Sequence, residues 1–147
     1  MPQHEKSLAE KLVGTWLMVS STSTKPDGTK TDRSNLKSVV IYSRDGHFAF
    51  VSVSPDLPKI AANDRAKATP QEAQAVVAGS IAYFGTYSVN ETDNVVIAKV
   101  EGSTFVNLIG GVAQKRVITS LTQDELRFTN PATPSGETLE FVWRRAK

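Results

Sequence analysis

Short apolar runs rich in β-branched and aromatic residues fill most of this 147-residue chain, and turn sequences separate them. The clearest turn is Asp45-Gly46, between the runs 35–43 and 47–54, because an Asp-Gly pair in such a position strongly favours a tight β-hairpin. Between 54 and 80 the chain has a loop and its one long helix-like run. Further strands are predicted at 13–24, 80–89, 95–103, 112–121, 126–130 and 138–145.

Strands that follow one another through short turns must be antiparallel neighbours. Eight such strands can close into a barrel that is just wide enough to hold side chains or one small ligand. The last five strands show no long crossover connection, which disfavours a β-sandwich. We therefore predict an all-β fold, an eight-stranded antiparallel up-and-down barrel with a short N-terminal helix and one inserted helix.

Both predicted helices begin with a capping signal. Ser7 and Glu10 have the spacing of a capping box, which predicts a helix of one or two turns at the N-terminus. A second capping box begins at Thr69 and includes a proline at the first helical position, and Gly79 can end the helix. The inserted helix is predicted at about 70–78, and we expect it to cover the mouth of the barrel with the loop before it.

Composition restricts the class of protein. With 39% hydrophobic and 22% charged residues, the chain is expected to form a single domain over 1–147 with its own core. It has no cysteine, so disulfides and thiolate chemistry are excluded. A net charge of +2 without a basic stripe argues against nucleic-acid binding. The lack of a secretory or membrane-spanning apolar run predicts a cytoplasmic protein with no membrane contact; whether it forms a homodimer is left open.

Several stretches of the chain carry a family likeness, and they occur in order across nearly its whole length. They are "LVGTWLMVS", "IYSRDGHF", "ATPQEAQAVVAGSIAYFGTYSVN", "VEGSTFVNLIGG" followed by "QKR", and "LEFVWRR". With these stretches the chain resembles the lipocalin-like domain family of the calycin superfamily, in its small single-domain bacterial and fungal form. The resemblance implies an eight-stranded barrel with a central pocket, and it implies no single function.

The resemblance also suggests a role for the glycine and tryptophan that open the first strand. In calycins the tryptophan of a Gly-x-Trp opening closes the narrow end of the barrel, under a basic side chain from the last strand. Here that strand carries Trp143 and Arg145 on one face, and it should pair with the first strand. We therefore expect Gly14, Trp16 and Arg145 to form a structural plug, with Gly14 letting the strand bend beneath the indole.

Two tyrosines are candidates for contact with a ligand. Tyr83 and Tyr87 are four residues apart in a predicted strand, so they share a face, and Gly85 between them is expected to leave open space. Two interpretations remain open: the rings fill the barrel with their hydroxyls at its rim, or the hydroxyls orient a ligand in an apolar cup.

Three charged residues stand in the middle of apolar strands. Lys99 and Glu101 share one face of their strand, and the other face is more apolar, which favours an exposed position for this pair. Arg116 lies on the same face as Gln114 and Ile118. If Arg116 is buried, it needs a carboxylate from the protein or from a ligand.

The chain shows no Gly-x-Ser-x-Gly motif, no P-loop and no dinucleotide fingerprint, and His4 and His47 lack the spacing of metal ligands. We therefore predict that the barrel binds a small, mainly apolar molecule without cofactor or metal. The predicted ligand-binding residues are Met18, Tyr42, Phe50, Tyr83, Tyr87, Arg116, Phe128 and Phe141. The alternative is a cofactor-independent isomerase, cyclase or dehydratase for a polyketide- or terpene-like substrate, with a tyrosine as proton donor and Arg116 stabilising an enolate. A third interpretation is an interaction module that uses the outer face of the barrel.

Overall fold

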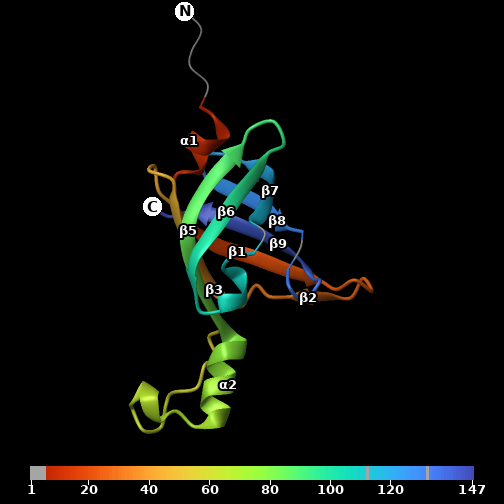
Figure 1. The fold of residues 1–147 in the computed structure, drawn as a ribbon. Helices are drawn as coiled ribbons and strands as arrows, with labels where there is room; N and C mark the ends of the chain where they lie inside the picture. Colours follow the sequence, from red (N-terminus) through yellow and green to blue (C-terminus); the bar gives the residue numbers. More distant parts are fainter. Residues whose placement is uncertain (1–5, 112, 132) are drawn as a thin grey trace, which may run out of the picture.

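Antiparallel strands close into a β-barrel in the computed structural model, which describes residues 6–111, 113–131 and 133–147 (Figure 1). Neighbouring strands follow the order of the chain, and β1 pairs with β9 to close the barrel, which confirms the predicted architecture. The eight barrel strands are β1 (Gly14–Thr24), β3 (Lys37–Tyr42), β4 (His47–Val53), β5 (Ser80–Asn90), β6 (Val95–Ser103), β7 (Gln114–Leu121), β8 (Glu125–Asn130) and β9 (Thr138–Arg145).

A short additional strand was not predicted from the sequence. β2 (Lys30–Asp32) pairs with the last residues of β1, while β3 pairs with the first residues of β1, so both extend the same edge. All three residues of β2 are exposed and none is apolar, so the strand carries no hydrophobic alternation by which to recognise it.

Both helices begin at the predicted capping boxes. Helix α1 (Leu8–Leu12) is capped by Ser7 and Glu10, and its last residue is fully buried at one end of the barrel. Helix α2 (Pro70–Gly79) is capped by Thr69 and Glu72, and it includes the glycine that was expected to follow it. Two single 3₁₀ turns, η1 (Arg65–Lys67) and η2 (Val106–Leu108), lie in connecting loops. Within the described residues no helix is both long and apolar enough to cross a membrane.

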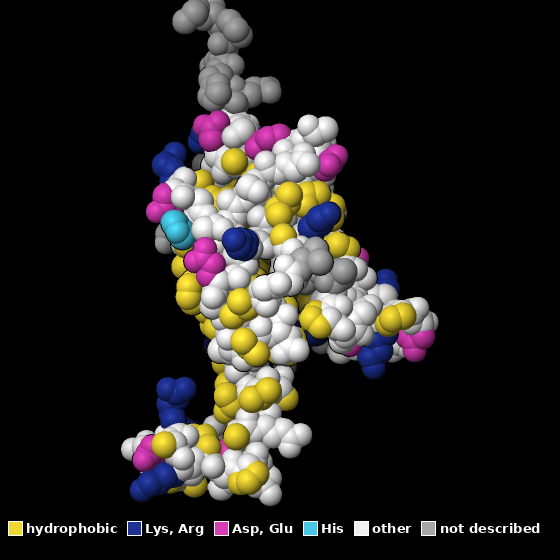
Figure 2. Space-filling view, viewed as in Figure 1, with side chains coloured by type: hydrophobic (Ala, Val, Ile, Leu, Met, Phe, Trp, Pro, Cys, Tyr) yellow, Lys and Arg dark blue, Asp and Glu magenta, His cyan; other side chains and the backbone are white. Residues whose placement is uncertain are grey.

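The expectation that α2 covers the barrel mouth is wrong. The helix and the loop before it project away from the barrel as a separate arm (Figures 1 and 2). None of its residues is buried, and Val77 is 79% exposed. β5 begins at the residue after α2, so no linker exists that could turn the helix back over the opening. In addition, its two valines are adjacent in sequence and form no stripe that could pack on the rim.

A β-bulge in β1 decides which of its side chains face the interior. Trp16 and Met18 point inward, and the register with β9 then shifts between Met18 and Ser20. After the shift Ser21 and Ser23 are buried, although strict alternation from Trp16 would have placed them outside. The bulge therefore brings two hydroxyls into the second half of the barrel.

The residues of the predicted plug lie together at the end of the barrel at which β1 begins. Trp16 is fully buried, and its Nε1 donates a hydrogen bond to the carbonyl oxygen of Leu12 at 2.9 Å. The guanidinium carbon of Arg145 lies 4.2 Å from the centre of the Trp16 ring system, as a cation–π contact requires. The same guanidinium donates hydrogen bonds to the carbonyl oxygens of Val13 and Lys11, each at 2.7 Å.

The backbone conformation and the neighbour of residue 14 explain why it is a glycine. Its φ of +138° is in a region that side chains rarely adopt, and a Cβ there would lie 2.6 Å from Nη1 of Arg145. The glycine therefore makes room for the guanidinium at the first residue of β1.

Truncation of the plug should strongly destabilise the barrel. We expect Trp16→Ala to lower the free energy of unfolding by about 3–5 kcal/mol, as for other large aromatic truncations in cores. Phe84→Ala is a suitable control because that aromatic is 55% exposed on the outer face, and it should cost less. Urea unfolding measures both variants, and equal losses would contradict the role of Trp16 as a plug.

The two capping boxes should differ in their effect on the whole protein. Thr69→Ala removes a cap worth about 1 kcal/mol from a helix that has no buried residue and contacts the barrel mainly at the start of β5, so amide exchange in α2 should accelerate while the barrel melts as before. Ser7→Ala removes the same kind of cap from α1, which is anchored by buried Leu12, and should lower the melting temperature. An equal loss of melting temperature in both variants would show that α2 is part of the cooperative unit.

Candidate functional site

A cavity of about 460 Å³ occupies the end of the barrel opposite the plug. Its walls are mainly apolar and come from β1, β4, β5, β7, β8 and β9 and from the loops before β3, around η2 and before β9. Three aromatic side chains of β4, β8 and β9 line it, and they contact one another or Trp143 behind them. The apolar lining residues are Leu36, Phe50, Ile81, Tyr83, Phe105, Leu108, Phe128, Pro134, Leu139 and Phe141.

Arg116 and Tyr83 form a hydrogen-bonded pair in the cavity wall. Arg116 is only 7% exposed, and its Nη2 donates a hydrogen bond to the phenolic oxygen of Tyr83 at 2.8 Å. Its Nη1 donates to the carbonyl oxygen of Lys115 at 3.0 Å. The Tyr83 ring stacks on Phe50, with the ring centres 5.0 Å apart, so the phenol is held in position by packing.

The positive charge of Arg116 has no anionic partner in the described part of the chain. The ion pairs found there are His47 with Asp45 and Arg127 with Glu125, both on the surface. Glu137 lines the mouth of the same cavity, but its carboxylate accepts a 2.5 Å hydrogen bond from the hydroxyl of Ser23 and forms no ion pair with Arg116. The interior of the barrel therefore contains a cation whose known partners are two neutral oxygens.

The positive charge of Arg116 also affects the pKa of a second buried tyrosine, Tyr42. Burial raises the pKa of the Tyr42 hydroxyl far above its ordinary value, and the charge of Arg116 opposes that rise. Tyr42 is fully enclosed among aromatic rings and does not line the cavity. At neutral pH it is a neutral phenol and acts as part of the core.

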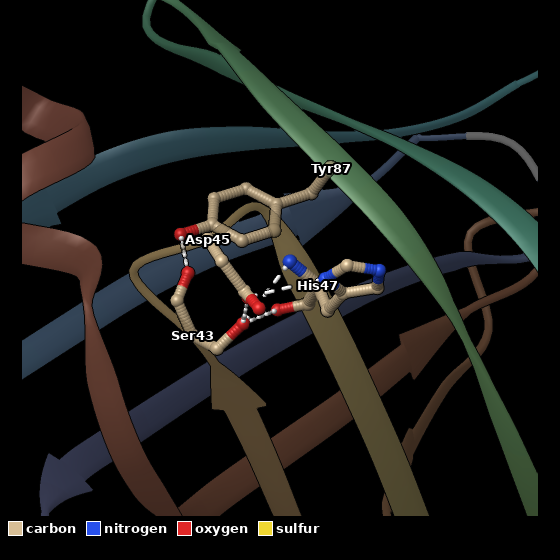
Figure 3. A network of polar contacts seen from close by, with 4 residues as sticks. All are labelled: Ser43, Asp45, His47 and Tyr87. Carbon is tan, nitrogen blue, oxygen red and sulfur yellow. Dashed lines mark hydrogen bonds and ion pairs between the residues drawn. The ribbon is translucent and has the colours of Figure 1, made fainter.

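Tyr87 lies beyond the cavity, toward the closed end of the barrel. Its ring packs edge-on against Tyr42, and its hydroxyl donates a 2.7 Å hydrogen bond to the carbonyl oxygen of Ser43 (Figure 3). Burial raises the pKa of the Tyr87 phenol, and the nearby carboxylate of Asp45 adds to the rise. The hydroxyl is thus used to hold the β3–β4 turn.

The same turn contains a serine, an aspartate and a histidine. The Ser43 hydroxyl bonds to the Asp45 carboxylate, and His47 Nδ1 lies 3.1 Å from that carboxylate (Figure 3). These contacts lower the pKa of Asp45, the serine hydroxyl most strongly. A nucleophilic serine needs a hydrogen bond to the imidazole, whereas here the hydroxyl bonds to the carboxylate. With the side chains of His47 and Asp45 62% and 74% exposed, the network stabilises a surface turn.

The structure divides the predicted ligand-binding residues into two groups. Phe50, Tyr83, Arg116, Phe128 and Phe141 line the cavity. Met18, Tyr42 and Tyr87 point into the barrel but pack toward the plug, so they are separate from the cavity.

The structure also shows whether the three charged residues of the apolar strands are buried or exposed. Lys99 and Glu101 are exposed, as predicted, while Arg116 is buried. No group of three described His, Cys, Asp or Glu residues is arranged to hold a metal ion, and His4 lies outside the described residues.

The expectation that Gly85 opens space between the tyrosines is wrong. A Cβ on this glycine would overlap the carbonyl group of Lys99 on β6, so the two backbones already meet at this point. The close approach coincides with a register shift between Phe84 and Gly85. The glycine therefore serves strand pairing at a β-bulge and adds no volume to the cavity.

Sequence reasoning missed several polar groups of the cavity. Ser21 enters through the bulge in β1, Ser52 and Asn130 lie at the ends of their strands, and Glu137 lies in the loop before β9. Alternation along β4 and β8 could have placed Ser52 and Asn130 inside. For Ser21 and Glu137 the placement depends on contacts between distant segments, which no local pattern encodes.

The contact at Gly85 leads to a testable difference between two glycines. We expect Gly85→Ala to lower the free energy of unfolding by about 1–3 kcal/mol or more, because its methyl group has no room against the β6 backbone. Gly111→Ala should have little effect, since nothing lies within 4 Å of a Cβ at that position. Chemical denaturation measures both, and a neutral Gly85→Ala would contradict the close approach.

Comparison with known families matches residues 13–146 to the lipocalin-like domain family. Among solved structures, a lipocalin-like protein from Bacteroides uniformis is similar at 14% identity and a TM-score of 0.50, over 92% of this chain and 99% of that one. A bovine odorant-binding protein in complex with a selenium-containing odorant shares 14% identity at a TM-score of 0.46, over 100% of this chain and 78% of that one. A polyisoprenoid-binding domain from Saccharophagus degradans shares 11% identity at a TM-score of 0.42, over 92% and 99%. The search of curated proteins found no match.

Proposed function

The chain belongs to the lipocalin-like domain family, and we propose that its barrel binds one small, mainly apolar molecule in the cavity between β4, β5, β8 and β9. The observation that carries this proposal is the cavity itself. It has about 460 Å³, apolar walls and a few convergent polar groups. Sites for small molecules have volumes of roughly 300–1,000 Å³ and this same composition.

The two ends of the barrel differ, and this difference supports entry of a ligand from one end only. Trp16, Leu12 and Arg145 fill the end where β1 begins, so a ligand has no path there. The opposite end is bordered by half-buried or exposed residues such as Arg33 and Phe105. The register places Arg116 level with Asn130, nearer this open end than Phe128 and Phe141, so a molecule that enters there can contact both the Arg116–Tyr83 pair and the aromatic rings.

The enzymatic alternative requires a proton donor or acceptor among the residues that line the cavity. A proton transfer needs a titratable group in contact with the substrate. Glu137 is the one carboxylate among the described lining residues, and it lies at the mouth, bonded to Ser23. Tyr83 is the one lining phenol, and its oxygen already accepts a hydrogen bond from Arg116. These observations favour a binding site over a catalytic one.

A neutral fluorescent probe tests the proposed function. N-phenyl-1-naphthylamine should give saturable fluorescence enhancement at one site per chain, and decan-1-ol should displace it. Ile81→Trp fills the cavity and should weaken probe binding at least about tenfold, because the indole would occupy the ligand's volume. Ala82→Trp on the outer face of β5 is the matched control and should leave binding intact. Non-saturable binding, or equal binding by both variants, would contradict a site in the barrel.

A further inference from the structure

We propose that the molecule bound in the barrel carries a carboxylate, which pairs with Arg116 and accepts a hydrogen bond from Tyr83. This inference rests on the proposed function and names the chemistry of the ligand's polar end. It starts from the buried guanidinium, which no described acidic side chain neutralises.

A permanent charge in an apolar barrel requires an explanation. Burying a charge without a counter-charge is costly, and most ionisable groups avoid that cost by becoming neutral. Arginine does not have this option, because its guanidinium stays protonated at any pH a protein experiences. The described protein supplies Arg116 with two neutral acceptors, the carbonyl of Lys115 and the phenol of Tyr83. An anion delivered by the ligand would provide the missing charge.

The hydrogen-bond pattern selects the kind of anion. A guanidinium has five N–H donors in one plane and no acceptor, and only two of them have the described partners above. Tyr83 uses its oxygen as the acceptor for Arg116, so its own O–H is left to donate. The pair therefore presents donors only. An ionised carboxylate is a planar group that only accepts, and it matches the guanidinium fork.

The remaining charges of the cavity argue against other polar ends. An amine would bring a second cation beside Arg116. A phosphate monoester would bring close to two negative charges to one buried cation, while the charges of Arg33 and Glu137 offset each other at the mouth. A single negative charge on an apolar body fits one buried arginine surrounded by Phe50, Phe128 and Phe141.

Competition against the neutral naphthylamine probe tests this inference with three compounds that share one chain length. Decanoate, decan-1-ol and decylamine differ only in their polar end, so their relative affinities report on that end. At pH 7.5 we expect decanoate to bind about tenfold or more tightly than decan-1-ol, because a hydrogen-bonded charge pair contributes this much. Decylamine should be the weakest of the three.

The variants separate the cation from the general charge of the protein. Arg116→Met should abolish the preference for decanoate while it still binds decan-1-ol and the probe. Lys115→Met removes one positive charge from the next, exposed position of the same strand and should keep the preference. Arg116→Met should also melt at or above the wild-type temperature, since replacing an unpaired buried charge by an apolar side chain removes its desolvation cost. If Arg116→Met does not fold, Tyr83→Phe still tests the pair: it should reduce the preference several-fold.

The possible results distinguish failure of the carboxylate inference from failure of the proposed function. Equal binding of decanoate and decan-1-ol by the wild type, or a preference that survives in Arg116→Met, would overturn the carboxylate while leaving the apolar binding site. Failure of the probe and of all three decyl compounds to bind would overturn the proposed function, and the inference with it.

Discussion

The contact between Arg145 and Trp16 holds together segments from both ends of the chain. The guanidinium covers the indole and donates hydrogen bonds to carbonyl groups before β1 and in the β7–β8 turn, while the indole itself bonds to the end of α1. These carbonyls would otherwise be left at the rim of a closed barrel without regular partners. Pairing of β1 with β9 and docking of α1 both converge on this point, so buried side chains fill one end of the barrel. The cavity lies at the other end.

Two inward-directed arginines share the barrel, and their surroundings set their roles. Arg145 is partly exposed and donates hydrogen bonds to three carbonyl oxygens, so its charge is spread over fixed dipoles and reaches solvent. Arg116 lies deeper and has two neutral acceptors in the described structure. The first arrangement is complete within the protein, whereas the second is complete only with a further acceptor. The contacts of Arg145 therefore stabilise the closed end, and the charge of Arg116 is the basis of the ligand chemistry proposed above.

Local signals in the sequence predicted the strands and both capping boxes, because hairpin turns, caps and alternation act over a few residues. The plug was expected from the family resemblance, and alternation along the last strand only placed Trp143 and Arg145 on one face. The cavity was predicted less well. Bulges in β1 and at the β5–β6 pairing shift the register by one residue, and this brought Ser21 inside and closed the space at Gly85. The direction of α2 depends on its direct junction with β5. The hydroxyl of Tyr87 donates its hydrogen bond to Ser43, in a turn that is distant in sequence. Arg116 was recognised as a candidate, but its burial and its missing counter-charge required the three-dimensional arrangement.

The arm formed by the loop after β4 and by α2 joins two residues that already face each other, since Val53 and Ser80 are cross-strand partners. In topology it is therefore an enlarged hairpin turn. The entropy cost of closing such a loop grows only slowly with its length, so the pairing of β4 with β5 hardly depends on what the arm contains. We therefore expect that the arm can differ in length and sequence without a change in the order or register of the barrel strands.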